Sequence, residues 1–489
     1  MKTRLSIILS ILLFGILDMA ADTPYVYVYR NDSAFHYLDV TRPLQFSYSS
    51  MTADSTRQLV IIRPEDSDSM FVPFDAVDSI RLANKAIPDI YINLTEEPEL
   101  TDLIRQRGKS YIYPAKLRMD GHGAYDDIEE LDVEFRGRGN STWWMPKLPY
   151  RFKMAKKRSV CGLPKAKTFA LLANFIDGSH ARNFFALRAA QMLEMPYTNH
   201  AIPVRVHLNG HTKGLYMLTE KIGIGSGSVD IDEEKGMLFE LDIALDEDYN
   251  HIYKWIAGNS EYLLPVMVKD PDINEIAEGR GINPNEYWLK WRDDFSAFAD
   301  SITSSTPDSD LSSVLDIDSA VNYFLVYNIS GNSEITHPKS VYMHKDSIDD
   351  VYHFGPVWDF DWAYTYSRGT GTQSANFILL NPYGEMDGKH FFRIIVRNKE
   401  FQKRFGERWN YFKTECYPRL LEELDEYAEL IRPAAYEDGY IWKDGHISYG
   451  DGEPTSLHHK KRIDELKAWL KRRVSYISAA VNYALAPRY

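Results

Sequence analysis

The sequence has little cysteine and no long apolar run beyond its first residues. Among 489 residues the only cysteines are Cys161 and Cys416, and neither stands in a CxxC motif or a zinc-ligand spacing. A disulfide framework is therefore excluded; the pair could form one bridge, but we predict two buried thiols. No later stretch offers the ~18 uninterrupted apolar residues that a membrane helix needs. We expect no transmembrane segment in the mature chain.

Positive charge is also in deficit. The chain has 56 Lys and Arg against 70 Asp and Glu, for a formal net charge of -14. This balance argues against nucleic acid or anionic lipid as a general partner, so any polyanion must be held by a local basic site. With 44% hydrophobic and 26% charged residues, the chain is too apolar to be disordered, and its length predicts two or more folded units.

The beginning of the chain has the layout of a secretory signal peptide. Lys2 and Arg4 precede the apolar run Leu5–Leu17, and small residues follow at positions 20 and 21. We predict a signal peptide over residues 1–21 that is cleaved, and a mature chain that is secreted, periplasmic or on the cell surface. A retained membrane anchor is the weaker alternative, because the run is short for a span.

The residues that follow predict a β-rich unit and then a mixed one. Short alternating runs such as Tyr25–Tyr29 and Leu59–Ile62, separated by polar clusters, indicate a small all-β module over residues 22–86. Beyond a break at residues 83–88, the next predicted elements are strands at Ile90–Ile92, Ala115–Met119 and Leu131–Phe135, a helix at Arg182–Leu193, and strands at Ile202–Leu208 and Gly214–Leu218 joined by the hairpin turn Asn209–Gly210.

The last part of the chain is predicted to be helical. Apolar residues recur at intervals of three and four over Glu400–Leu430 and His458–Leu485, with charges between them. Pro418 predicts a break or kink inside the first of these helices. The pattern of the whole chain therefore indicates an α+β protein with a helical C-terminal part.

A glycine-bearing loop followed by cations is the first candidate for chemistry. Gly137–Thr142 is rich in backbone donors, and Lys147, Arg151 and Lys153 follow it. Phosphate binding needs these two ingredients, although a tight β-turn with surface cations would have the same sequence. Alternation along the strand places Arg151 and Lys153 on one face, from which a lysine could reach the phosphates of a nucleotide.

A pair of acids among aromatic residues is the second candidate. In Gly355–Trp362, Asp359 and Asp361 would share one face of an extended chain, roughly 6 to 7 Å apart at the backbone. Two neighbouring carboxylates repel each other unless a cation or a proton neutralises them, so the pair suits a hard divalent cation. A solvated turn with two acids is the alternative.

Two further loops carry weaker signals. The polar stretch Gly331–Ser340 lies between apolar segments ahead of the acid pair, and it could supply a base and a cation. Tyr216–Lys221 ends a strand and leads into the glycine-rich stretch Gly223–Gly227, which could offer backbone edges to a flat ligand. Ordinary loop polarity and an ordinary strand end explain these stretches equally well.

Together these segments resemble the CotH family of spore-coat-H-like atypical protein kinases, and the chain looks like a secreted, Bacteroidetes-type member. The resemblance extends from about Pro88 to the acid pair and beyond. Its carriers are RGNSTW (138–143), PKLPYRFK (146–153), LLANFID (171–177) with Arg182 and Asn183, LNG (208–210), GLYMLTE (214–220) and WDFD (358–361). The module over residues 22–86 also resembles a β-domain seen ahead of such proteins, and it could dock to a cell-surface partner.

The resemblance implies a two-lobed, protein-kinase-like fold over residues 87–489, with an N-lobe over about 87–225 and a C-lobe over about 226–489. It also implies ATP and Mg²⁺ in the cleft and transfer of the γ-phosphoryl group to Ser or Thr of a protein acceptor. Lys153 would steady the phosphates, Glu220 would lie where the lobes join, Asp359 would hold the metal, and Asp361 would be a second ligand or a support. The other residues assigned to cofactor binding are Arg138, Asn140, Lys147 and Arg151.

The chain departs from the family pattern at two positions. Active members have Asp in the loop that corresponds to Gly331–Glu334 and a metal-ligating Asn a few residues later, whereas this chain has Glu334 and Lys339 there. Glutamate can act as a base, and the charged lysine could neutralise phosphate instead of binding metal. We therefore assign Glu334, Lys339 and Asp359 to catalysis.

Two other functions remain open. A catalytically degenerate kinase fold could act as a cell-surface or periplasmic binding or assembly protein. Hydrolysis of a glycan by the paired acids is a distant third, because neighbours on one strand cannot easily flank a sugar.

Overall fold

The computed structural model of the chain describes residues 25–30, 35–39, 45–49, 58–63, 68–83, 87–96, 101–242, 253–257, 264–336, 338–364, 390–444 and 456–485. The predicted signal peptide lies outside these residues. Within them, no helix combines the length and apolar character that a membrane crossing requires. Cys161 and Cys416 are both free and buried, which confirms the prediction of two buried thiols.

The N-terminal part is β-rich, as predicted. Its strands form two 3-stranded sheets in the orders β2-β1-β6 and β3-β4-β5. Apolar side chains that alternate along β1 and β4 pack between the sheets and give this part a small core of its own. The strands are β1 (Tyr25–Arg30), β2 (Phe35–Asp39), β3 (Gln45–Ser49), β4 (Gln58–Arg63), β5 (Asp68–Pro73) and β6 (Val77–Ala83).

A closed barrel follows, with the strand order β10-β11-β13-β12-β7-β8-β9. All neighbours are antiparallel except β7 and β12, whose parallel pairing closes the barrel. Every second residue of β8 is buried, which is the alternation that the sequence shows. The strands are β7 (Asp89–Leu94), β8 (Tyr113–Asp120), β9 (Ile128–Gly137), β10 (Tyr150–Arg158), β11 (Ala166–Leu172), β12 (Ile202–Leu208) and β13 (His211–Glu220).

The predicted hairpin between β12 and β13 is confirmed. Asn209 and Gly210 have φ angles of 49° and 78°, the left-handed values that a two-residue hairpin turn requires. The helix predicted at Arg182–Leu193 is also confirmed as α2 (Arg182–Met192), and α1 (Thr101–Arg107) precedes it.

A 5-stranded sheet in the order β15-β16-β14-β17-β18 and most of the helices form the rest of the molecule. Four of these helices, α3, α4, α5 and α7, begin at an Asp or Asn side chain that accepts a hydrogen bond from the first turn. The strands are β14 (Met237–Leu241), β15 (Lys254–Ala257), β16 (Leu264–Asp270), β17 (Val341–Lys345) and β18 (His353–Phe354). The helices are α3 (Ile273–Arg280), α4 (Pro284–Thr303), α5 (Ile317–Ser330), α6 (His390–Arg397), α7 (Lys399–Tyr411), α8 (Tyr417–Ile441) and α9 (His459–Leu485).

The predicted break near Pro418 is confirmed. A single π-helical turn, Phe412–Cys416, joins α7 to α8, and Pro418, which has no N–H to donate, lies directly after it in the first turn of α8. The structure is thus an α+β fold with a helical C-terminal part, as the sequence predicts.

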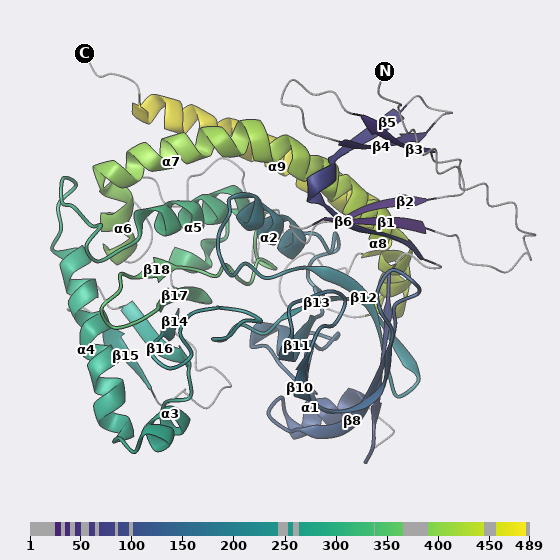
Figure 1. Ribbon diagram of the computed structural model, residues 1–489, viewed down its shortest axis with the longest axis horizontal. Coiled ribbons are helices and arrows are strands. Elements are labelled where there is room, and N and C mark those ends of the chain that lie inside the picture. Colours follow the sequence, from purple (N-terminus) through teal and green to yellow (C-terminus); the bar gives the residue numbers. More distant parts are fainter. Residues whose placement is uncertain are drawn as a thin grey trace, which may run out of the picture.

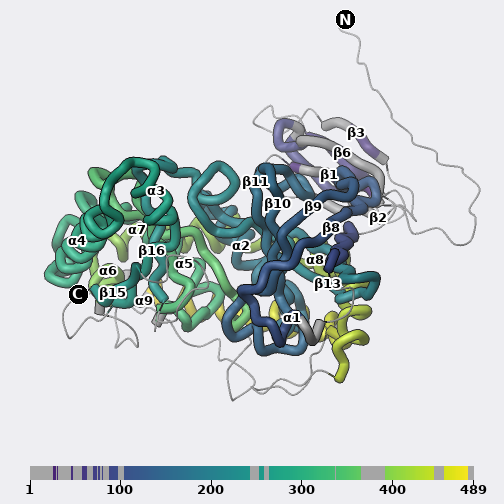
Figure 2. The backbone as a smooth tube through the Cα atoms, turned by 90° about the horizontal axis from the view of Figure 1, so that it is seen from below, coloured from purple at the N-terminus to yellow at the C-terminus, as the bar shows by residue number. Residues whose placement is uncertain are grey.

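Figures 1 and 2 show how these parts are arranged. The barrel lies at one end of the molecule and α3, α4 and α6 at the other, with α2 and α5 between them. Helix α8 packs against β13 of the barrel and against α2, so the C-terminal helices join the two ends. One continuous apolar core runs through both. The predicted domain limits at residues 86 and 225 stay predictions.

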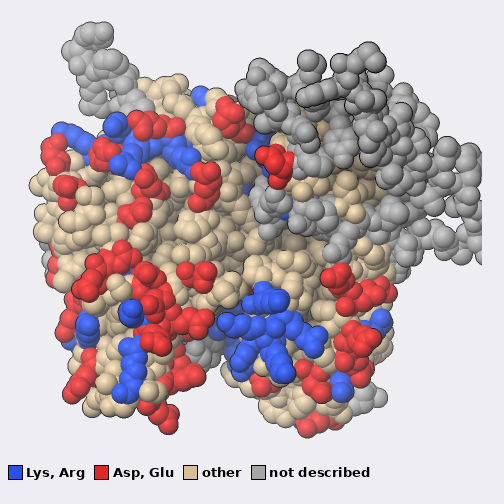
Figure 3. All heavy atoms as spheres, viewed as in Figure 1, with Lys and Arg blue, Asp and Glu red and all other residues tan. Residues whose placement is uncertain are grey.

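Charge is unevenly distributed over the surface. Lys and Arg gather over β10 and β11, whereas Asp and Glu gather over the region of β15, β16 and α4 on the same face (Figure 3). A second group of Lys and Arg lies over α7, so the basic residues of this face form two separate groups although the chain as a whole is acidic (Figure 3).

Candidate functional site

The predicted acid pair lies in the loop after β18. Asp359 has a φ of 64°, a left-handed conformation, so the prediction of an extended chain through the pair is wrong. The loop turns here because α2 holds it: the Asn183 amide donates a hydrogen bond to the Asp361 carboxylate, and the backbone N–H of Phe360 donates to Asn183 Oδ1 at 2.9 Å. A side chain of α2 therefore fixes both the turn and the second acid.

The Asp361 carboxyl is buried next to other acids. Burial raises its pKa from 3.8 to about 7, and the negative charges of Asp359 and Asp177 act in the same direction. The hydrogen bond from Asn183 offsets only part of this shift. The site therefore holds an excess of negative charge that a proton or a bound cation would relieve.

This shift predicts a particular pH dependence for the metal-free protein. The folded state keeps the Asp361 proton between about pH 4 and about 7, whereas the unfolded state has lost it, so the contribution of this group to stability falls as the pH rises. We expect the thermal midpoint in EDTA to fall more from pH 5 to pH 8 in the wild type than in an Asp361→Asn variant. An equal change in the two proteins would contradict the assignment.

Glu334 follows α5 in a short 3-10 helix, Ser333–Thr336. Asn332 connects this turn to the acid pair: its Oδ1 accepts from the Glu334 N–H at 3.0 Å, and its Nδ2 donates to the Asp359 carbonyl at 2.8 Å. Gly331, with a φ of 65°, ends α5 in the left-handed conformation that lets the chain turn toward Asp359. The predicted polar loop and the predicted acid pair are thus in contact.

Glu334 and Lys339 form an ion pair inside this cluster. Lys339 Nζ lies 3.7 Å from Glu334 Oε1, and Glu334 Oε2 is buried with no hydrogen-bond partner among the described residues. Burial raises the pKa of Glu334 well above its usual value, and the charge of Asp359 adds to this effect. Burial disfavours the charged form of Lys339, but Glu334, Asp359 and Asp242 together raise its pKa. Lys339 therefore stays protonated, and its charge offsets part of the upward shift in the pKa of Glu334.

The glycine-bearing loop reaches the same place through Arg138. Its guanidinium lies 5.5 Å from the ring centre of Trp358, the residue before Asp359. The Arg138 N–H donates to the Pro149 carbonyl at 3.1 Å, which ties the loop to the start of β10. Arg138 is thus the residue of the first motif that contacts the segment of the acid pair, through Trp358.

The other predicted phosphate ligands lie apart from this contact. Asn140 accepts a hydrogen bond from Lys109 at 2.8 Å, and Lys153 is exposed, with its Nζ 3.7 Å from Glu134 on β9. Arg151 is half-buried on the same face of β10 as Lys153, as predicted.

Lys147 has no exposed side-chain surface. Its Nζ lies 2.5 Å from Asp438 Oδ1 of α8 and also donates to the Leu215 carbonyl. A nucleotide does not reach an ammonium group enclosed in this way, so we leave Lys147 out of the proposed site.

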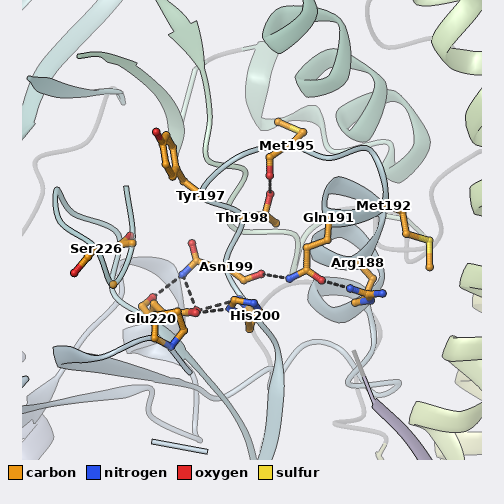
Figure 4. A pocket seen from close by; sticks show the side chains of 13 residues that line it. Arg188, Gln191, Met192, Met195, Tyr197, Thr198, Asn199, His200, Glu220 and Ser226 are labelled. Carbon is orange, nitrogen blue, oxygen red and sulfur yellow. Dashed lines mark hydrogen bonds and ion pairs between the residues drawn. The ribbon is translucent and has the colours of Figure 1, made fainter. Parts of the chain in front are cut away.

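Glu220 is buried at the end of β13 and lines a cavity of about 340 Å³ (Figure 4). Its carboxylate shares a hydrogen bond with the His200 ring and accepts another from the His200 N–H at 3.0 Å, while Asn199 donates to its carbonyl at 2.7 Å. Neither Glu334 nor Asp359 lines this cavity. The structure therefore places Glu220 in a hydrogen-bonded cluster of its own.

The acid cluster fits a divalent cation in charge and in ligand type. Asp359 and Asp361 offer carboxylate oxygens, the ligand type that a hard divalent cation takes. The described residues contain no group of three or more His, Cys, Asp or Glu arranged to hold a metal ion. Mg²⁺ with a nucleotide does not need such a group, because it takes one or two carboxylates and completes its shell with phosphates and water.

Several residues of the site are missing from the sequence-based assignment. Asn183 and Asn332 position the acids, and Asp242, buried directly after β14, adds negative charge near Glu334 and Lys339. Asn183 belongs to a segment that carries the family resemblance, but nothing local shows which acid it contacts. A polar residue directly after the fully buried strand β14 is the only signal that could have indicated Asp242.

The site is a partly buried acid cluster with one lysine, set in an α+β fold. Residues 133–477 match the family described as CotH kinase protein. This span is more than half of the chain, so the chain belongs to the CotH family and is a kinase-like protein by that membership. No curated protein matches it. The family resemblance seen in the sequence is confirmed; the Bacteroidetes-type origin and the export of the chain stay predictions.

Proposed function

We propose that this protein is an exported, atypical kinase-like enzyme that transfers the γ-phosphoryl group of ATP to Ser or Thr of a protein acceptor, with Mg²⁺. In this proposal the barrel end is the N-lobe and the sheet with its helices is the C-lobe of a two-lobed kinase-like fold. One observation carries the proposal: the charges of Glu334, Lys339 and Asp359, which are separated in sequence, interact in one cluster in which Glu334 is buried and the other two are half-buried. Family membership supports it independently.

The residues have different roles in the proposed reaction. Asp359 would hold Mg²⁺, which when bound would neutralise charge on the phosphate oxygens. Asp361, fixed by Asn183, would support Asp359 or serve as a second ligand. Arg138 and the cations on β10, Arg151 and Lys153, would contact the phosphates from the barrel side.

Glu334 and Lys339 would act on the acceptor and the transferred group. The acceptor hydroxyl oxygen attacks the γ-phosphorus, the bond to the bridging oxygen breaks, and ADP leaves, while Glu334 takes the hydroxyl proton. To act as a base Glu334 must be ionised, and the positive charge of Lys339, 3.7 Å away, favours that form. Lys339 would neutralise charge on the transferred group in place of a second metal.

The proposal is tested by incubating the mature protein with labelled ATP, Mg²⁺ and a Ser/Thr-containing acceptor protein. We expect label on the acceptor, and none when EDTA replaces Mg²⁺. Transfer that does not depend on Mg²⁺, or no transfer at all, would contradict it.

A Glu334→Gln variant tests the assignment of the base. The amide keeps the size of the side chain but cannot take the proton, so we expect kcat to fall roughly 100-fold or more, with little change in KM for ATP. A Glu334→Asp variant keeps the carboxylate but moves it by about 1 Å, so its kcat should lie between those of the wild type and the Gln variant. Equal rates for the Gln variant and the wild type would remove Glu334 from catalysis.

A second candidate function is a non-catalytic binding or assembly protein on the cell surface. The ion pair of Glu334 with Lys339 favours it, because this contact occupies one oxygen of the proposed base with a cation. The N-terminal β-rich part, residues 22–86, would then be the docking element. This function predicts that ATP does not bind in a magnesium-dependent way.

A further inference from the structure

The β10–β11 hairpin carries an unusual concentration of positive charge. No Asp or Glu occurs between Glu134 and Asp177, although the chain as a whole is acidic. The hairpin has five exposed cations besides the predicted phosphate ligands Arg151 and Lys153: Lys156, Lys157, Arg158, Lys165 and Lys167. We call these five residues the basic hairpin surface.

Little of this charge is compensated within the molecule. Lys157 Nζ lies 3.7 Å from Glu233, and both side chains are about half exposed or more, so solvent weakens their attraction. The other members of the basic hairpin surface form no ion pair with any residue that the structure describes. The surface therefore presents a cluster of cations that remains available to a partner.

The hairpin is also shaped to present these cations. Residues 155–159 are all exposed, whereas Val160, Cys161 and Leu163 at the turn are buried and fix its position. Figure 3 shows the cations gathered over β10 and β11, with acidic residues across the same face near β15 and α4. The positive region over the hairpin is thus held by its buried turn residues and lies apart from the acidic region.

We propose that the basic hairpin surface binds an acidic polypeptide segment. The complementary charge of Asp- and Glu-rich peptide would speed association and orient the partner. Because the positive region is small and negative charge surrounds it, a short flexible segment can contact it without approaching the acidic part of the molecule.

Other polyanions fit this surface less well. Single-stranded nucleic acid is held partly by stacking on aromatic side chains, and the large exposed apolar and aromatic side chains of the described residues all lie outside the β10–β11 hairpin. A duplex or an anionic membrane extends beyond the positive region, where the net charge of -14 would repel it.

The position of the surface connects it with the proposed function, on which this part of the inference rests. Arg151 and Lys153 continue the same strand toward Tyr150, which pairs with Gly137 beside the Arg138 loop. A segment bound along β10 would therefore lead toward the contact of Arg138 with Trp358. The acceptor of the proposed kinase would then carry its Ser or Thr close to a run of acidic residues.

Fluorescence anisotropy tests the binding directly, with a labelled Glu/Ser peptide titrated into the full chain at low salt. Gln/Ser and Lys/Ser peptides of equal length are the peptide controls. We expect the Glu/Ser peptide alone to bind, and its affinity to fall about 10-fold or more in a K156E/K157E/R158E variant. The matched control reverses three exposed cations of α9, Lys460, Lys471 and Arg472, and should leave the affinity unchanged.

Several results would overturn the proposal. These are equal affinity in the hairpin variant and the wild type, an equal loss in the α9 control, or tighter binding of a single-stranded DNA oligonucleotide or of phosphatidylglycerol vesicles than of the peptide. If the K156E/K157E/R158E variant has a lower thermal midpoint than the wild type, a K156Q/K157Q/R158Q variant is used in its place. We then expect a smaller loss of affinity for the Glu/Ser peptide. Peptide that binds but is never phosphorylated would contradict the proposed kinase function and leave the docking surface standing.

Discussion

Replacing Asp359 with alanine is expected to lower phosphoryl transfer by roughly 1,000-fold or more, the scale on which phosphoryl transfer depends on charges placed around the phosphates. Asp359 lies between the loop that holds Glu334 and the turn that α2 fixes through Asn183. Its carboxylate is the one that the proposal assigns to Mg²⁺. Transfer of label from ATP to the acceptor, measured at saturating Mg²⁺, gives the rate.

The control for this variant removes an aspartate outside the cluster. Asp349 is exposed in the loop between β17 and β18, so Asp349→Ala should keep wild-type activity. An Asp359→Asn variant separates charge from shape, because the amide fills the same space. If Asp359→Ala transfers label as fast as Asp349→Ala does, Asp359 has no role in the reaction.

Replacing Lys147 with methionine is expected to destabilise the fold by about 3–5 kcal/mol, because it leaves the buried Asp438 carboxylate without its main counter-charge. Burial alone would raise the pKa of Asp438, but Lys147 and His180 outweigh it and hold that pKa below its usual value. Leu215 N–H also donates to Asp438, at 3.0 Å, so the carboxylate joins the barrel to α8. Chemical denaturation measures the free energy of unfolding.

Two further variants make the result specific. A Lys147→Met/Asp438→Asn double variant leaves no buried charge and should recover part of the lost stability. Lys156→Met, on the exposed end of β10, should change the free energy of unfolding by no more than about 0.5 kcal/mol. A loss in Lys147→Met no larger than that in Lys156→Met would show that the ion pair is unimportant.

The sequence predicts those elements of the fold in which local pattern and environment agree. Strand β8 alternates between buried and more exposed residues, the second half of β12 alternates between buried and half-buried residues, and α8 and α9 are amphipathic, so periodicity identifies them. Strand β14 is buried at every position and α5 is buried along most of its length, so neither has a polar face to set a period. These elements follow from tertiary packing, which a local pattern does not contain.

Some features of the site can likewise be predicted from the sequence, and others depend on residues distant in the chain. Residue type and spacing identify the loop of Glu334 and the acid pair, and the structure brings them together. Lys147 and Lys153 have similar sequence surroundings, yet Lys147 is buried and Lys153 is exposed. Lys147 is buried because it pairs with Asp438 of α8, a residue that is distant in sequence. The left-handed turn at Asp359 likewise depends on Asn183, which is distant in sequence.

The central claim is that the cluster of Glu334, Lys339 and Asp359 binds ATP together with Mg²⁺, and calorimetric titration of ATP into the full chain tests it most directly. We predict binding in the micromolar range with Mg²⁺, strongly weakened in EDTA and in the Asp359→Ala variant. Absence of binding with Mg²⁺, or an affinity that neither EDTA nor the substitution changes, would contradict the claim and favour the non-catalytic function.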